Sequence, residues 1–516
     1  MQNFYKIILY KATLRRCYDS MIFKVQKYRN IMKDFLLSTL FIGVSIFVGN
    51  AQDFITVSYN DIEGSKEYIT GNDYQKDLLL YSKTLELTHP YYADSVNVNA
   101  LRSMTMLKYE DCAHVADHST FRTHLQEMIY HLDDGHTQVA TTSHNELIYP
   151  LYLMFDTKES AYVLAIEDDY KSALGKRVAL INDKPLSDII SKAHKLISGD
   201  NEVFKNKKLS NMLQVKSFWE KCGYRENHIR LTFEDSTSIT IPATTAHDFV
   251  LEQLSLEFNS PTVPREVPFY YQIFDSLNIC YLQFNICFDS LNYPQLGQRF
   301  DDFIEGMMAD IKARSIGVLV IDVRNNGGGN SALCDLLLSY LTDFNQMKNM
   351  GCKVRMSELL LKFQPNFTDV VLNNGSKPQL GDVFDLLDVK WNNEEEAMSP
   401  HRINRDPDKI FKGNVIFISG RGTFSSAGLL LTLARDNGIG TIIGETPGHR
   451  PSHYGDILQF SLPNTGIKAT VSCRYISRPN EQLNEEKELV PDVLLNLSDY
   501  TKPTDAAWDW IIEHYH

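Results

Sequence analysis

The stretch NVIFISGRGTFSSAGLLLTLARDNG, residues 414–438, joins an apolar run to a helical pattern through a turn that carries two serines. Residues 414–419 are almost all apolar, which is typical of a buried strand. From residue 426 onward the apolar side chains recur at helical spacing. The stretch therefore predicts a strand, a turn and a helix, which together are the repeating unit of a layered α/β domain. Ser425 and Ser426 lie at the junction.

A second unit of the same kind lies earlier, in IGVLVIDVRNNGGGNSALCDLLLSYL, residues 316–341. Here the junction holds Gly327, Gly328 and Gly329, which let backbone N–H groups approach a ligand at a positive helix end. The loop lacks both the G-x-G-x-x-G spacing and the lysine of a P-loop. The glycines therefore favour a developing oxyanion over a nucleotide phosphate.

Together the two junctions predict a site for acyl transfer. Acyl transfer needs a nucleophile at a helix start and N–H groups aimed at the tetrahedral oxygen. A serine before an apolar helix is often only a helix cap, so capping is the alternative for Ser425. The glycine loop on the neighbouring junction favours the nucleophile.

The remaining chain divides into further regions, because 516 residues exceed one ordinary core. We expect an upstream extension and signal peptide over residues 1–51, a helical domain over 52–146, a β-rich domain over 147–260 and an α/β domain over 261–516. Within the β-rich domain, RVALINDKPLSDII at residues 177–190 resembles part of a PDZ-type peptide-binding domain. An ordinary hairpin followed by a helix explains the same residues.

The first residues predict export. From Met32 the sequence reads MKDFLLSTLFIGVSIFVGNAQ, with a lysine, an apolar run from Phe35 to Val48 and then small residues, which is the pattern of a signal peptide. We expect the true start at Met32, a mature chain beginning near Gln52, and a periplasmic or extracellular location. A membrane anchor is the alternative, but the run is shorter than the roughly 20 residues of a spanning helix. No stable membrane insertion is expected after cleavage.

Charge and cysteine spacing exclude other classes. A net charge of −14 argues against nucleic acid as a partner, which would need a clustered basic face. Seven of the eight cysteines follow the predicted cleavage point, and none has the spacing of a metal site. We expect them to be buried as small apolar residues, and we expect no metal and no cofactor. They are Cys112, Cys222, Cys280, Cys287, Cys334, Cys352 and Cys473.

Four motifs occur in the order found in one peptidase family. They are LDDGHTQV at 132–139, DVRNNGGG at 322–329, GTFSSAG at 422–428, and GETPGHRPSHYGD at 444–456 followed by VPDV at 490–493. The chain resembles the C-terminal-processing serine peptidases, together with the tricorn-core and interphotoreceptor-retinoid-binding-protein branch. The resemblance implies a crotonase-like or Clp-protease-like α/β catalytic domain, and therefore a serine peptidase over 261–516.

The resemblance also implies roles for residues at the two junctions. The nucleophile of the family falls on Ser425, and the next residue, Ser426, supplies a backbone N–H to the oxyanion hole. Gly328 is the preferred second donor. Gly329 and Gly327 are alternatives, because the Asn-Pro-Gly-Gly of the family is here Asn-Gly-Gly-Gly at 326–329.

The general base separates the two branches of the family. The processing peptidases use a lysine where this chain has GHR at 448–450, so His449 stands in its place. The tricorn-like branch uses a histidine from before the catalytic domain, which falls on His136. Because imidazole titrates near neutrality, it can accept the serine proton and return it to the leaving amine. His136 is therefore the predicted base.

An orienting group for His136 is also implied. The branch places a glutamate shortly before its Pro-Asp motif, which indicates Glu485, with Glu486 and Glu488 as neighbours in the same acidic run. Asp133 and Asp134 beside the histidine are alternatives.

The predicted function is an exported serine endopeptidase that hydrolyses polypeptide substrates through an acyl-enzyme on Ser425. The alternative is a catalytically inactive peptide- or lipid-binding relative. The sequence predicts neither the physiological substrate nor the oligomeric state, and it leaves open whether residues 391–409 form a lid.

Overall fold

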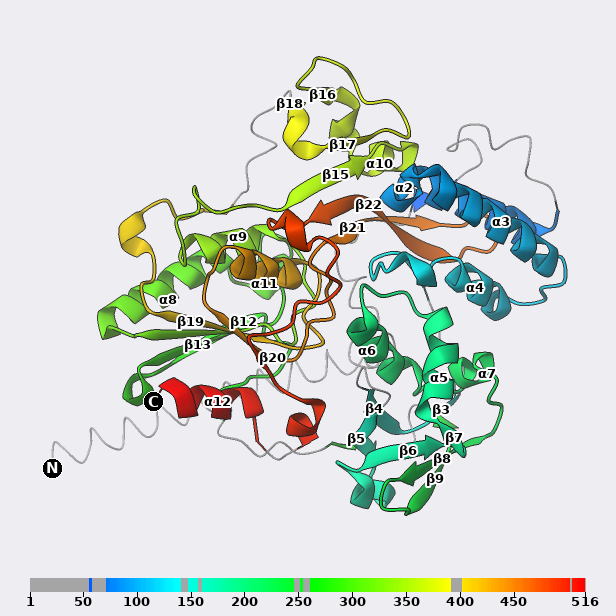
Figure 1. Cartoon of the computed structure of the whole chain (residues 1–516), viewed down its shortest axis with the longest axis horizontal. Helices are drawn as coiled ribbons and strands as arrows, with labels where there is room; N and C mark the ends of the chain where they lie inside the picture. The colour runs from blue at the N-terminus through cyan, green and yellow to red at the C-terminus, as the bar shows by residue number, and fades with distance from the viewer. Residues whose placement is uncertain are drawn as a thin grey trace. The chain divides into compact units, whose positions relative to one another are not determined.

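The computed structural model describes residues 55–57, 71–140, 147–155, 160–245, 251–253, 260–390, 401–501 and 504–515. The chain divides into two compact units, Met1–Phe47 and Val48–His516. The predicted signal peptide, and residues 391–400 of the predicted insertion, lie outside the described residues. All the described residues belong to the second unit. Figure 1 draws their helices and strands in colours that follow the residue number.

The two serine and glycine junctions belong to one six-stranded sheet, in the order β12-β13-β14-β19-β20-β23. From β13 to β23 neighbouring strands run parallel, while β12 pairs antiparallel with β13. Parallel strands read as continuous apolar runs when both faces of the sheet are covered, and all five residues of β14 are buried. The strands are β12 Phe269–Phe274, β13 Ile279–Phe284, β14 Val318–Asp322, β19 Asn414–Ser419, β20 Thr441–Gly444 and β23 Val493–Leu494.

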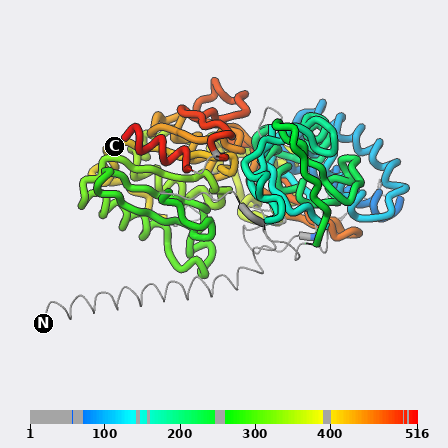
Figure 2. Tube along the Cα trace, turned by 90° about the horizontal axis from the view of Figure 1, so that it is seen from below, coloured from blue at the N-terminus to red at the C-terminus, as the bar shows by residue number. Residues whose placement is uncertain are grey.

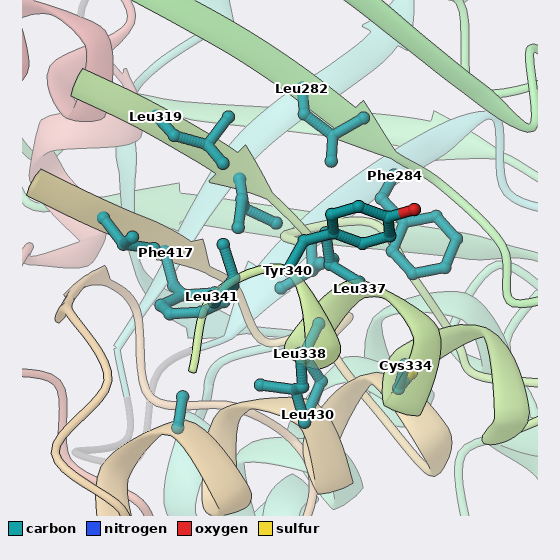
Figure 3. Close-up of a cluster of buried hydrophobic side chains, with 14 of the residues drawn as sticks. Leu282, Phe284, Leu319, Cys334, Leu337, Leu338, Tyr340, Leu341, Phe417 and Leu430 are labelled. Atoms are coloured by element: carbon teal, nitrogen blue, oxygen red, sulfur yellow. The ribbon is translucent and has the colours of Figure 1, made fainter. Parts of the chain in front are cut away.

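Helices cover both faces of this sheet. On one face lie α8 (Phe300–Arg314), α9 (Ala332–Ser339) and α11 (Ser426–Asp436). Figure 3 shows part of the core between these helices and the strands, where leucines of α9 pack against Leu282, Leu319 and Phe417. On the other face α12 (Ala506–Tyr515) buries Trp508 and Ile511 against the strands, and Figure 2 shows this helix running beside them. The predicted α/β layering is confirmed.

A second sheet has the order β1-β21-β22-β15-β17, and β2 pairs with β22. Helices α2 (Asp73–Thr88), α3 (Ser95–Cys112) and α4 (His118–Glu127) share one apolar core with its strands. The helices of the predicted 52–146 region thus bury their apolar faces against strands that come from 351–385 and 453–477. The strands are β1 Ile55–Thr56, β2 Gln138–Val139, β15 Gly351–Arg355, β17 Val383–Asp385, β21 His453–Ser461 and β22 Lys468–Ser477.

The β-rich region forms a third sheet, in the order β11-β5-β6-β8-β9, with β4 on β5 and β7 on β6. Helices α5 (Leu186–Ala193), α6 (Glu202–Met212) and α7 (Lys216–Lys221) contribute to its core. Between β6 and β7, Asn182 and Asp183 both have positive φ, which is the geometry of a tight hairpin turn. The strands are β4 Leu151–Phe155, β5 Ala161–Glu167, β6 Arg177–Ile181, β7 Lys184–Pro185, β8 His228–Phe233, β9 Ser238–Pro242 and β11 Leu251–Gln253. The PDZ assignment stays a prediction.

The structure describes further short elements. Four strands form two small two-stranded sheets, β3 Leu147–Ile148 with β10 Thr244–Thr245 and β16 Val371–Leu372 with β18 Val389–Lys390. Helix α10 (Glu358–Phe363) precedes β16. All seven cysteines within the described residues are free thiols, and all but the half-buried Cys352 are buried, as predicted. Among the described helices, none has both the length and the apolar character needed to cross a membrane.

Candidate active site

Ser425 sits in a strained turn at the start of α11. Its φ of 52° and ψ of −127° are unusual for a residue with a side chain, and such a conformation costs about 1–3 kcal/mol when the surroundings enforce it. The backbone N–H of Phe424 donates to the Asn326 carbonyl at 3.0 Å, which ties this turn to the glycine loop. A sharp strand-to-helix turn of this kind exposes a serine hydroxyl for attack.

The hydroxyl of Ser425 makes no capping bond to the helix that it precedes. The capping alternative therefore does not account for this serine. The neighbouring side chain has a different task, because Ser426 Oγ donates to the Gly329 carbonyl at 2.7 Å. The Ser426 hydroxyl thus connects the glycine loop to the helix, whereas the Ser425 hydroxyl has no such capping role.

The glycine loop lies directly against the turn. Gly328 and Gly329 have φ values of 100° and 139°, in the region that favours glycine. A methyl group at Gly328 would lie 2.6 Å from Ser425 Cβ and 2.9 Å from the Ser426 nitrogen. Only a residue without a side chain allows this close approach.

The N–H groups of the two junctions differ in their availability. Gly328 N–H donates to Asn326 Oδ1 at 2.8 Å, and the buried Asn326 side chain also donates to the Phe284 carbonyl. The N–H groups of Gly329 and Ser426 donate to no residue that the structure describes. Gly329 with Ser426 is therefore the better donor pair, which favours the alternative register over Gly328.

Replacing Gly328 with alanine should lower kcat/KM by about 100-fold, the scale of a disrupted oxyanion hole, because the methyl group must displace Ser425 or the Ser426 N–H. Gly297→Ala is the matched control: Gly297 also has positive φ, at 72°, but no described atom lies within 4 Å of a methyl group there. Steady-state kinetics and thermal melting of both variants check this. Equal turnover by the two would contradict the proposed contact.

His136 is buried at the junction of the helical region with the second sheet. Its carbonyl accepts a hydrogen bond from Thr470 Oγ1 at 2.6 Å, and the next residues pair as β2 with β22. The imidazole packs on Phe424, with 4.6 Å between the ring centroids. Because Phe424 directly precedes Ser425, this contact brings the predicted base to the turn that holds the predicted nucleophile.

A second aromatic ring also packs on Phe424. The ring of Phe204, from α6, stacks on it with 4.1 Å between centroids and 2° between planes. The β-rich region thereby supports the ring on which His136 packs. This stack could not be predicted from the sequence, because phenylalanines in two distant apolar stretches are typical of an ordinary core.

Asp134 lies where an orienting carboxylate is needed. Its Oδ1 accepts from the His136 backbone N–H at 2.7 Å and lies 3.7 Å from His136 Nδ1. Its Oδ2 lies 3.0 Å from His89 Nε2 and accepts from Ser472 Oγ at 2.8 Å. Burial by itself raises the pKa of Asp134, but the contacts with His136 and His89 outweigh this effect and hold the pKa well below its usual range. This carboxylate is therefore ionised at neutral pH.

The other predicted orienting residues lie elsewhere. Glu485 is exposed in the loop after the short helix Glu481–Leu483, and the structure describes no contact between it and His136. Glu486 accepts from Arg478, and Asp133 pairs with Lys205 and Lys487. The geometry therefore favours Asp134 over Glu485.

His449 is a second buried histidine near the turn. Its ring lies against Gly428 in the first turn of α11, and its Nδ1 is 3.5 Å from Asp200 Oδ2. Burial and the nearby His136 lower its pKa well below the usual value. The sequence placed His449 where the processing peptidases have a lysine, and the structure brings it to the same neighbourhood as His136.

Asp200 was not expected. It is fully buried, and its Oδ1 accepts from the Gly135 N–H at 2.6 Å. The ligand atoms of Asp134, His136 and Asp200 lie within 4.8 Å of one another, so these residues have the donor types of a metal site. Sequence spacing showed no such group, because Asp200 is more than sixty residues from the other two.

The comparisons with known proteins agree with this geometry. Residues 288–495 match the model of peptidase family S41. The chain carries a peptidase family S41 domain. It is a serine-type peptidase, and the predicted resemblance to the C-terminal-processing peptidases is confirmed. The matched S41 segment contains the glycine loop and both serines but not His136, so the predicted base comes from outside it.

Solved structures show the same fold. One is mature CPAF complexed with lactacystin, with a TM-score of 0.60 and 13% identity over 86% of this chain and 97% of that one. Another is mature CPAF, with a TM-score of 0.58 and 14% identity over 85% and 95%. The predicted α/β protease fold is confirmed by these matches. A comparison with curated proteins gives no significant match.

Proposed function

We propose that this S41 peptidase is an exported endopeptidase that cleaves polypeptides through an acyl-enzyme on Ser425. One observation carries the proposal. The strained Ser425 turn abuts a glycine loop, with the N–H groups of Ser426 and Gly329 left as donors and the His136 ring packed on the adjacent Phe424.

The first half of the reaction forms the acyl-enzyme. Ser425 Oγ attacks the carbonyl carbon of the scissile peptide bond while His136 Nε2 accepts the hydroxyl proton. The negative charge that develops on the carbonyl oxygen is stabilised by the N–H groups of Ser426 and Gly329. When the tetrahedral intermediate collapses, the protonated His136 gives its proton to the leaving amine.

The second half releases the product. Water attacks the ester carbonyl, His136 accepts a proton from that water, and the same two N–H groups stabilise the second tetrahedral oxygen. Asp134 acts through His136: its ionised carboxylate favours the tautomer with the proton on Nδ1, which leaves Nε2 to accept. No step requires a metal or an organic cofactor.

The other domains support substrate delivery in this proposal. The helical region supplies His136 and Asp134, and the β-rich region, as a PDZ-like module, binds an extended segment of the substrate by adding it to a sheet edge. The signal-peptide pattern from Met32 directs the chain out of the cytoplasm, with a mature start near Gln52. Mass spectrometry of the N-terminus of the exported protein tests this location.

The experiment for the activity itself uses an unstructured polypeptide such as casein, with fragments identified by mass spectrometry. Internal cleavage by the wild type, and none by Ser425→Ala, is the expected result. An intact substrate with a folded wild-type protein would instead support the inactive peptide- or lipid-binding alternative.

Chelation should leave turnover unchanged, since none of the proposed steps uses a metal. We expect the same kcat, within about twofold, before and after treatment with EDTA and desalting. Activity that is lost with EDTA and returns with added zinc would contradict the proposed reaction.

A further inference from the structure

The buried side chains of Asp134, His136 and Asp200 carry atoms of the kind that coordinate a metal ion, in addition to the role in proton transfer proposed for Asp134 and His136. Asp134 and Asp200 are fully buried, and His136 is 5% exposed. Asp134 Oδ1, which faces His136, accepts one backbone hydrogen bond, from the His136 N–H. Asp200 Oδ2, which faces His449, also accepts one, from the Arg450 N–H. Each oxygen therefore keeps a lone pair for another partner.

His449 provides a separate observation that points to a ligand. It is 1% exposed, and neither of its ring nitrogens makes a hydrogen bond to any residue within the described ranges. Its Nδ1 lies 3.5 Å from Asp200 Oδ2, so it faces the group. Asp134 Oδ1 lies 3.7 Å from His136 Nδ1, which is too long for a hydrogen bond, so this nitrogen also lacks a hydrogen-bond partner among the described residues. Buried polar atoms in native proteins nearly always have a partner, so these nitrogens indicate an additional bound group.

We propose that Asp134, His136, Asp200 and His449 form a binding site for a divalent transition-metal ion, best matched by zinc, and that zinc bound there inhibits the peptidase. Two imidazoles and two carboxylates are ligands that zinc accepts in tetrahedral geometry. Zinc holds nitrogen and oxygen ligands at about 2.0–2.2 Å. The ligand atoms of Asp134, His136 and Asp200 are within 4.8 Å of one another, and His449 Nδ1 lies 3.5 Å from Asp200 Oδ2, so binding requires these side chains to rotate toward one ion.

The inhibitory effect rests on the proposed function. In that reaction the neutral His136 ring carries its proton on Nδ1 and accepts at Nε2. A metal on Nδ1 requires the single ring proton to sit on Nε2, which can then no longer accept the proton of Ser425. Zinc also engages Asp134, the carboxylate that favours the productive tautomer. The ion therefore acts as a reversible inhibitor of the metal-free enzyme.

Binding is tested without reference to activity. Untagged Ser425→Ala protein is titrated with Co²⁺, whose visible absorption reports four-coordinate nitrogen and oxygen ligands. One Co²⁺ per chain, displaced by Zn²⁺, is expected. In this background Asp200→Asn and His449→Gln should each weaken Co²⁺ binding at least about tenfold, whereas His228→Ala, an exposed histidine at the start of β8, should not change it. No absorption band, or unchanged affinity in either site variant, would overturn the site.

Inhibition is tested with active protein. Turnover of the wild type should fall as Zn²⁺ is added and recover with EDTA, and the half-inhibitory Zn²⁺ concentration should rise at least about tenfold in Asp200→Asn. A Co²⁺ band together with zinc-insensitive turnover would overturn the inhibitory role. A metal-free wild type with no peptidase activity would instead contradict the proposed function, and the Co²⁺ titration would still decide the site.

Discussion

Substitution of His136 by alanine should lower kcat by at least about 100-fold, the scale of general-base catalysis. The imidazole packs on Phe424, beside the nucleophile, and its neighbour Asp134 is ionised. His136→Gln should be no better, because an amide keeps polarity and approximate size but cannot accept a proton. Steady-state kinetics on a peptide substrate measure both.

His449→Ala is the matched control for this prediction. It removes another buried histidine near the same turn, whose pKa is lowered by burial and by the nearby His136 ring. Its effect on kcat should be much smaller than that of His136→Ala, once thermal melting shows that both variants are folded. Near-wild-type turnover in folded His136→Ala, or a larger loss in His449→Ala, would move the base to His449.

Replacing Ser425 with alanine should remove turnover almost entirely, by at least about 10,000-fold, which is the scale seen when a serine nucleophile is lost. Ser426→Ala should be milder, at about tenfold, because only its hydroxyl bond to the Gly329 carbonyl is lost while its backbone N–H remains. Kinetics of the two variants under one set of conditions give the comparison. Equal losses would show that the nucleophile has been assigned to the wrong serine of the pair.

The parts of the site that the sequence could predict are local. Each strand–turn–helix junction is encoded within about twenty-five consecutive residues, since the apolar run, the turn residues and the helical spacing follow one another. Ser425 and the glycine loop were found for this reason. Which glycine supplies the free N–H could not be predicted, because it depends on whether the Asn326 side chain accepts a hydrogen bond from Gly328 or from Gly329.

The groups around His136 depend instead on contacts between distant segments. Asp134 could be named as an alternative because it is two residues away, but its partners His89 and Ser472 come from α2's end and from β22. Asp200 is held in the site by hydrogen bonds from the N–H groups of Gly135 and Arg450, two segments far from it in the sequence. Nothing in the residues near Asp200 distinguishes it from an aspartate in a surface turn, so its burial could not be predicted.

The same limit applies to the fold. A helical domain was predicted over residues 52–146, yet the partner of its helices is a sheet whose longest strands begin more than 300 residues later. A pattern of apolar residues shows which face of a helix is buried and does not show what covers it.

Site-mapped labelling with a fluorophosphonate shows whether Ser425 is an activated nucleophile. The folded wild-type protein should become covalently labelled, with the phosphonyl group on Ser425 in the peptide map. His136→Ala should label far more slowly, and Ser425→Ala should not label at all. No labelling of the folded wild type, or a modification that maps to Ser426 or to another residue, would show that Ser425 is not the activated nucleophile.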